Sequence, residues 1–92
     1  MKGFKVNIPD RIFNKLKKFP KDRQKQILNK IELITETPEF LDIVKMRGRE
    51  DVYRLRVGDY RVIFVVDHVN KVINIDRLGT RSEMEKYYKL KV

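Results

Sequence analysis

The apolar residues of this chain follow a strand pattern at both ends and a helical pattern between them. Residues 4–8 alternate between apolar and polar side chains, and Pro9 follows directly. A period of two is typical of a strand with one face in water, and proline cannot donate the hydrogen bond that would continue the strand. The sequence therefore predicts a short N-terminal strand.

Helical patterns lie on both sides of Pro20. Ile12, Phe13 and Leu16 have helical spacing after Pro9, a residue that loses no hydrogen bond in the first turn of a helix. Over residues 21–37, one stripe collects the apolar side chains Ile27, Leu28, Ile31 and Ile34. Pro38 disfavours helical geometry at the preceding residue. We predict two antiparallel helices that form a hairpin near Pro20.

The second half of the chain returns to strand patterns. Residues 39–51 mix apolar and basic side chains and predict a turn with a loose strand. Clear strands follow over residues 52–57 and 60–66, with Gly58-Asp59 as a two-residue turn between them, and over residues 71–78.

A short C-terminal helix completes the predicted elements. Ser82 with Glu85 three residues later indicates a capping box that opens this helix. The order of elements predicts an α+β fold: an N-terminal strand, a helical hairpin, and an antiparallel sheet of three to four strands with the helices on one face.

Strand register converts this pattern into a candidate site. If Gly58 and Asp59 form the turn, Val57 pairs with Tyr60, and Arg56 lies opposite Arg61 on the adjacent strand. The helix-covered face then carries Tyr53, Leu55, Val57, Tyr60, Val62, Phe64, Ile73 and Ile75. Centring the next hairpin on His68-Val69 sets Ile63 against Asn74 and Arg61 against Asp76. The uncovered face then carries Arg54, Arg56, Arg61, Asn74 and Asp76.

Arginines that face one another across a sheet predict an anion site. Like charges in directly opposed positions are destabilising, so Arg56 and Arg61 oppose folding unless an anion lies between them. The planar guanidinium suits phosphate, and Lys45, Arg47, Arg49, Arg77 and Arg81 could widen the patch. The alternative is that these arginines are only the wet face of a one-sided sheet.

Composition restricts the partners and the chemistry. The 92 residues suit a single domain over residues 1–92, and 22 Lys and Arg against 13 Asp and Glu give a net charge of +9. Such a charge favours nucleic acid or an acidic protein partner. The chain has no cysteine and one histidine, His68, so metal-dependent hydrolysis is poorly supported. No segment reads as a membrane span or signal sequence, and we expect a soluble, cytoplasmic protein.

Three motifs and a tyrosine match a known family pattern. The motifs are KMRG at residues 45–48, VYRLRVGDYRVIF at residues 52–64 and GTR at residues 79–81, and Tyr87 follows them. On these residues, and over its full length, the chain resembles the RelE toxins of the RelE/ParE superfamily of type II toxin–antitoxin systems. RelE-like members are ribosome-dependent endoribonucleases that cleave mRNA, whereas ParE-like members share the fold and inhibit DNA gyrase without cleaving RNA.

The resemblance implies a metal-independent mRNA endonuclease that needs no cofactor. In this chemistry a ribose 2′-OH attacks the adjacent phosphate. Arg61 and Arg81 would stabilise the phosphorane, Tyr87 would accept the proton, and the backbone phosphates would be held by Arg54, Arg56, Lys45 and Arg47. Some RelE enzymes have lysines where this chain has Arg54 and Arg56, and Tyr88 could replace Tyr87, so the acid and base stay open.

The same resemblance implies partners and leaves rivals. The partners are the ribosome with its mRNA and an acidic RelB-like antitoxin, which wraps the toxin and dimerises the pair into a heterotetramer. A ParE-like gyrase inhibitor and a simple RNA-binding domain remain the alternatives.

Overall fold

The computed structural model describes the backbone of residues 1–91 and the side chains of residues 1–86. Its elements follow the order predicted for an α+β fold. In chain order they are β1 (Lys5–Asn7), α1 (Asp10–Leu16), α2 (Lys21–Glu36), the 3-10 helix η1 (Pro38–Phe40), β2 (Asp42–Lys45), β3 (Val52–Val57), β4 (Tyr60–Asp67), β5 (Val72–Thr80) and α3 (Arg81–Lys91). The N-terminal strand, the helical hairpin and the C-terminal helix are confirmed, and the loose strand predicted before residue 51 is β2.

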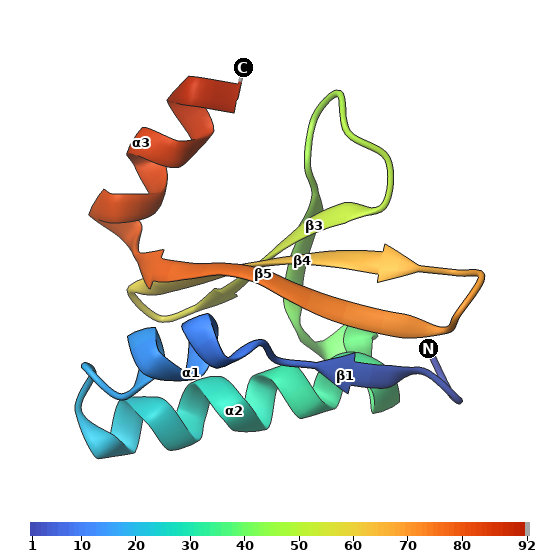
Figure 1. Ribbon diagram of the computed structural model, residues 1–92, viewed down its shortest axis with the longest axis horizontal. Helices are drawn as coiled ribbons and strands as arrows, with labels where there is room; N and C mark the ends of the chain where they lie inside the picture. Colours follow the sequence, from blue (N-terminus) through green and yellow to red (C-terminus); the bar gives the residue numbers. More distant parts are fainter. Residues whose placement is uncertain (92) are drawn as a thin grey trace.

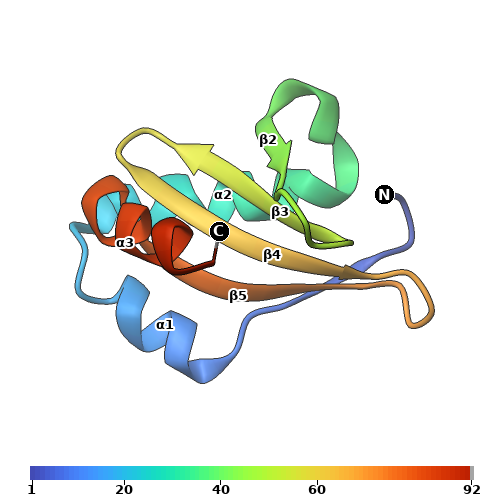
Figure 2. The same cartoon turned by 90° about the horizontal axis from the view of Figure 1, so that it is seen from above.

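The five strands form one sheet in the order β1-β5-β4-β3-β2. The pairs β2/β3, β3/β4 and β4/β5 are antiparallel, as predicted. The N-terminal strand β1 joins the sheet beside β5 and runs parallel to it, which makes the sheet mixed. Strands β1 and β2 are the two edges of the sheet, so the strands that carry the arginines lie between them. Figure 2 shows β3, β4 and β5 side by side in this order.

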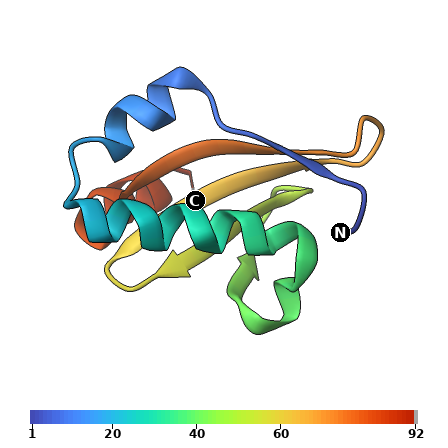
Figure 3. The same ribbon diagram turned by 90° about the horizontal axis from the view of Figure 1, so that it is seen from below.

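Helices α1 and α2 cover one face of the sheet, as Figures 1 and 3 show. The apolar stripe of α2 supplies Ile27, Ile31 and Ile34, each at most 1% exposed. The sheet contributes the alternate residues predicted for the covered face, and the buried members are Leu55, Val57, Val62, Phe64, Ile73 and Ile75. Burying these side chains is the main stabilising contribution to the fold. Because alternate residues of a strand point to opposite faces, burying this set also fixes which residues lie on the other face of the sheet.

The first hairpin has the predicted register. Val57 pairs with Tyr60, and Arg56 lies opposite Arg61. The turn residue Gly58 has a φ of +56°, a left-handed conformation that glycine adopts without a steric penalty. This tight turn places the two arginines side by side on the face that α1 and α2 do not cover.

The register predicted for the second hairpin is wrong. Arg61 pairs with Gly79 rather than Asp76, and Ile63 pairs with Arg77 rather than Asn74. Two features cause the shift: the last pair before the loop joins Asp67 to Val72, and a β-bulge interrupts the pairing between β4 and β5 at Ile63/Phe64. A bulge adds one residue to one strand, so every pair beyond it moves by one.

Helix α3 lies on the sheet face opposite α1 and α2 (Figure 1). Its Met84 packs with Val52 and Ile63 in a small second core. Gly79 permits this close approach, because a Cβ there would lie 3.2 Å from the Met84 sulfur. The capping box predicted at Ser82 and Glu85 is wrong: Thr80 and Glu83 form it, with the Glu83 N–H 3.4 Å from the Thr80 hydroxyl and the Thr80 N–H 3.0 Å from the Glu83 carboxylate.

Candidate active site

Four arginines from three elements line one pocket on the face opposite α1 and α2. Arg54 and Arg56 come from β3, Arg61 comes from β4, and Arg81 begins α3. The pocket has a volume of about 440 Å³, and its remaining lining residues are Gly58, Asp59 and Glu85. The three predicted sheet arginines and Arg81 are therefore brought together, and every cation among the described lining residues is an arginine.

Asp42 offsets part of this charge. It lies opposite Arg56 at the edge of the sheet, where its carboxylate is 3.1 Å from Arg54 Nη2 and 3.6 Å from Arg56 Nε. Sequence analysis missed Asp42, because the loop before β3 concealed the register of β2. The Nε of Arg54 is buried and has no hydrogen-bond partner within the described part of the chain, so Asp42 does not use every donor of this arginine.

The guanidinium of Arg61 is held by backbone carbonyls instead of a carboxylate. Its Nη1 donates to the Gly58 carbonyl at 2.7 Å and to the Tyr60 carbonyl at 3.0 Å. These partially negative oxygens reduce the repulsion between Arg61 and Arg56 without neutralising the charge. The predicted neighbour Asp76 binds Arg11 of α1 at 3.3 Å and does not line the arginine pocket.

The start of α3 is tied to the first hairpin. The backbone N–H of Arg81 donates to the Asp59 carbonyl at 2.7 Å. The Arg81 Nε lies 3.5 Å from a carboxylate oxygen of Glu85, one helical turn further along α3. Glu85 therefore enters the pocket with Arg81. The sequence had suggested it only as a capping residue, so its place in the site was missed.

Glu83 anchors the same helix from its other side. Its carboxylate forms an ion pair with Lys15 near the end of α1 and accepts hydrogen bonds from the N–H and hydroxyl of Thr80. The Lys15 ammonium group and the Thr80 backbone N–H stabilise the anion and lower the pKa of Glu83 to about 2. This contact joins α3 to the helical hairpin and fixes the direction in which α3 leaves the sheet.

The other predicted site residues lie elsewhere. Lys45 ends β2, and Arg47 lies in the loop before β3; both line a separate hollow with Met46 and Gly48. Figure 1 shows this loop on the same side of the sheet as α3. Lys45 pairs with Tyr53, which packs against the main core on the helix-covered face, and neither Lys45 nor Arg47 lines the arginine pocket. The side chains of Tyr87 and Tyr88 lie outside the described residues.

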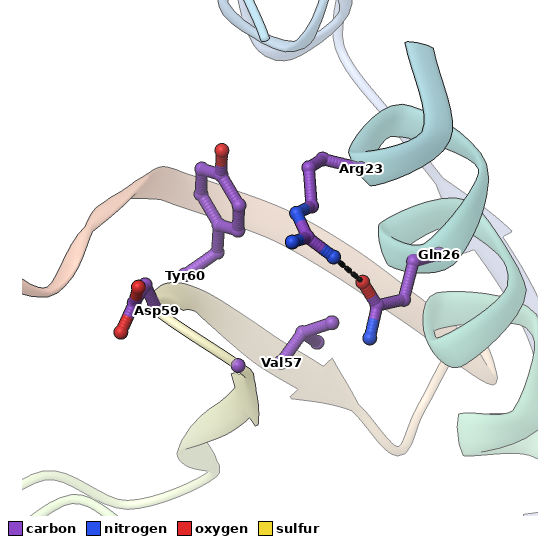
Figure 4. Close-up of a pocket in the computed structure, with 6 residues that line it drawn as sticks. Arg23, Gln26, Val57, Asp59 and Tyr60 are labelled. Carbon is purple, nitrogen blue, oxygen red and sulfur yellow. Dashed lines mark hydrogen bonds between the residues drawn. The ribbon is translucent and has the colours of Figure 1, made fainter. Parts of the chain in front are cut away.

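A smaller pocket of about 220 Å³ lies on the α2 side of the same turn. In Figure 4 the Arg23 guanidinium points into the space beside the Tyr60 ring and Val57. Its Nη1 donates to the side-chain oxygen of Gln26 at 3.2 Å. Arg23 is thus an exposed arginine near the turn that does not line the arginine pocket, which makes it a suitable control residue.

The single histidine lies away from the arginine pocket. His68 lies in the loop between β4 and β5, where its ring nitrogen is 3.1 Å from an Asp51 carboxylate oxygen. This loop is at the end of β4 that is far from the turn at Gly58.

Among the side chains described, no three acidic, histidine or cysteine residues gather as a metal-binding group. None of the helices within residues 1–91 has the length and apolar character needed to cross a bilayer.

Comparison with known proteins identifies one family across the chain. The family model described as the ParE toxin of the type II toxin–antitoxin system parDE matches residues 9–85. The RelE1 protein of Methanocaldococcus jannaschii is 33% identical over 82 residues, which are 86% of this chain and 91% of that protein.

Solved structures show the same similarity. The archaeal RelE–RelB complex from Pyrococcus horikoshii contains a chain with a TM-score of 0.73 and 34% identity, and the match covers 85% of this chain and 94% of that one. The RelB–RelE antitoxin–toxin complex from Methanococcus jannaschii gives a TM-score of 0.72 and 27% identity over 87% of this chain and 95% of that one.

Proposed function

This chain belongs to the RelE/ParE superfamily of toxins from type II toxin–antitoxin systems, and we propose that it is a RelE-type endonuclease that cleaves mRNA on the ribosome. The pocket lined by Arg54, Arg56, Arg61 and Arg81 carries this proposal. Guanidinium groups bind phosphate through paired hydrogen bonds, and groups held on a sheet lose little freedom when they bind. RNA backbone is the polyanion that such a pocket suits best.

The proposed chemistry is an attack of a ribose 2′-OH on the adjacent phosphate. The O2′–P bond forms while the P–O5′ bond breaks, which leaves a 2′,3′-cyclic phosphate and a 5′-OH. Negative charge develops on the phosphorane oxygens, and fixed cations that point at those oxygens stabilise the transition state. We assign this role to Arg61 and Arg81, which line the pocket from β4 and from the start of α3.

Arg54 and Arg56 are assigned to the phosphates on either side of the cleaved bond. They lie on the adjacent strand, and Asp42 holds them in place while leaving some of their donors unused. A pocket of arginines stabilises charge well, but positioning must supply much of the rate. This requirement is the reason we assign the ribosome, which orients mRNA, as the place of reaction.

An acidic antitoxin is the second proposed partner. The chains in the Pyrococcus and Methanococcus structures are held in RelE–RelB complexes. This chain has the charge to attract such a partner, since its net charge is +9. We propose that a RelB-like antitoxin covers the arginine pocket and joins two toxins in a heterotetramer.

A translation reaction with defined mRNA tests the proposed function. Purified protein is added, and primer extension maps the 5′ ends of the fragments. The expected result is discrete cuts within the reading frame that require ribosomes. The matched control contains the same mRNA and protein without ribosomes, and it should stay uncut. Intact mRNA in both reactions would overturn the proposal.

Gyrase inhibition is the second candidate function, because the family model that matches residues 9–85 bears the ParE description. A supercoiling assay with DNA gyrase, run in parallel with the translation reaction, separates the two functions. A RelE-type enzyme should leave supercoiling unchanged. Inhibited supercoiling together with intact mRNA would favour the ParE function.

A further inference from the structure

The arginine pocket lacks a proton acceptor among its arginines. A guanidinium has a pKa above ~12 and has no lone pair to offer, so it cannot remove a proton from a 2′-OH. The proposed reaction needs such an acceptor close to the scissile phosphate. The described lining residues that carry an ionisable oxygen are Asp59 and Glu85.

The contacts of these two carboxylates differ. Glu85 is held by a member of the pocket, since its carboxylate oxygen lies 3.5 Å from Arg81 Nε. No ion pair among the described residues joins Asp59 to a pocket arginine, and the backbone carbonyl of Asp59 anchors α3. Asp42 pairs with Arg54 and Arg56 from the β2 side and does not line the pocket.

We propose that Glu85 is the general base of the cleavage reaction. Its carboxylate takes the proton of the attacking 2′-OH as the O2′–P bond forms. The P–O5′ bond breaks, and water supplies the proton that the departing 5′-oxygen needs. Arg81 stabilises the phosphorane one helical turn from Glu85, so a single turn of α3 brings both groups to the reacting nucleotide. The inference rests on the proposed function.

The placement of Glu85 fits this role physically. Its side chain is 56% exposed and reaches the pocket from the helix end that Thr80, Glu83 and Gly79 hold against the sheet. The exposed carboxylate is available to substrate, and the Arg81 contact limits its orientations. A general base contributes roughly 10²–10⁴-fold to a rate, so its loss is measurable above the charge stabilisation that remains.

Single-turnover cleavage of ribosome-bound mRNA tests the assignment. Glu85→Gln removes the proton acceptor and keeps the shape of the side chain, and it should lower the rate by roughly 10²–10⁴-fold. The wild-type rate should fall towards acid pH, where the base is already protonated, and Glu85→Gln should not show this fall. Binding to ribosomes that carry mRNA with a 2′-deoxy nucleotide at the cut should change less than threefold. Glu32→Gln on α2 is the matched control and should cleave like the wild type.

A double variant separates a base from a residue that only orients Arg81. If Glu85 is the base, Arg81→Ala and Glu85→Gln remove different functions, and the combined variant should be slower than either single one. If the combined variant cleaves as fast as Arg81→Ala alone, Glu85 acts through Arg81 and the assignment is overturned. Glu85→Asp keeps a carboxylate. Partial recovery of the rate in this variant, with the fall in rate towards acid pH (the acid limb of the pH profile) still present, supports Glu85 as the base.

Tyr87→Phe provides the comparison with the proton acceptor that the family resemblance implies. Our inference predicts that Tyr87→Phe keeps the acid limb that Glu85→Gln loses. If Tyr87→Phe loses the acid limb and Glu85→Gln keeps it, Tyr87 is the residue that accepts the proton of the 2′-OH, and the inference is overturned. A wild-type protein that fails to cleave at all would overturn the proposed function, whereas a cleaving wild type with an unaffected Glu85→Gln overturns only the role of Glu85.

Discussion

At the scale of single residues, the site depends on how two facing arginines are tolerated. Arg56 and Arg61 lie opposite each other, as the hydrophobic alternation predicted, because the side-chain period of a strand is two. The compensating groups could not be predicted from the same pattern. Asp42 lies on a strand whose register depends on the loop between β2 and β3, and a pattern of side chains does not show the turn carbonyls that hold Arg61.

Removing the carboxylate of Asp42 should strengthen RNA binding. Asp42→Asn releases Arg54 and Arg56 from their ion pairs, and one more positive charge then faces the phosphates. We expect a several-fold higher affinity for a single-stranded RNA at low salt, and a salt slope steeper by up to about 1.

Fluorescence anisotropy at several salt concentrations measures both quantities. Because Asp42 is half exposed, the free energy of unfolding should change by less than about 1 kcal/mol. An unchanged or weaker affinity would show that Asp42 arranges the arginines for RNA instead of competing with it.

Glu83 should make stability depend on acid pH. Its pKa is about 2 in the folded protein and about 4.5 in the unfolded chain, so the stability it contributes is complete above pH 4.5. That contribution is lost as the pH falls towards 2. Because the side chain is nearly half exposed, we expect it to be about 1 kcal/mol.

Denaturant unfolding of the wild type and of Glu83→Gln between pH 2 and pH 7 measures this contribution. The difference between the two proteins should be largest at neutral pH and should vanish near pH 2. A constant difference across the range would mean that the Lys15 and Thr80 contacts do not depend on the charge of Glu83.

At the scale of elements, the position of α3 determines whether the pocket is complete. The sequence predicted this helix but not the face on which it packs, because that depends on the second hairpin. The bulge in that hairpin places Gly79 opposite Arg61. Because glycine has no side chain, the first turn of α3 packs closely against the sheet at this position. A hydrophobic pattern does not reveal a bulge, since apolar residues occur on both sides of it. The parallel partner of β1 was missed for a similar reason, because pairing distant in sequence leaves no local signal.

Shortening Met84 should loosen α3 while the main core stays intact. Met84 is 4% exposed and packs with Val52 and Ile63 in the small second core. We expect Met84→Ala to lower the free energy of unfolding by about 2 kcal/mol, at the low end for a buried methionine because this core is small.

Hydrogen exchange should show where the loss falls. Amides of α3 should exchange faster in Met84→Ala, while those of α2 keep their protection relative to global stability. The rate of mRNA cleavage should fall, since Arg81 and Glu85 are carried by the loosened helix. Uniformly faster exchange, with α2 as affected as α3, would show that the two cores unfold as one.

At the scale of the whole molecule, the net positive charge determines which classes of partner the protein attracts. Composition alone predicted a polyanion or an acidic protein as partner, and the structure concentrates part of that charge in the arginine pocket. Charge alone could not decide between these two partners, because the same positive surface attracts both RNA and an acidic antitoxin.

Competition between the two partners should therefore be visible. Addition of the proposed acidic antitoxin should release a bound RNA from the arginine pocket, and its association should slow as salt rises from about 50 to 200 mM. Stopped-flow fluorescence measures that rate. If antitoxin and RNA bind together without mutual weakening, the antitoxin does not cover the pocket.

Cleavage of ribosome-bound mRNA by Arg61→Ala, beside Arg23→Ala as the matched control, is the most direct test of the arginine pocket. Both variants lose one exposed or half-buried arginine near the same turn, but only Arg61 lines the arginine pocket. We predict that both remain folded, that Arg61→Ala loses the cuts by at least about 100-fold, and that Arg23→Ala keeps them with 2′,3′-cyclic phosphate ends. Equal cleavage by both variants, or equal loss, would contradict the assignment of catalysis to this pocket.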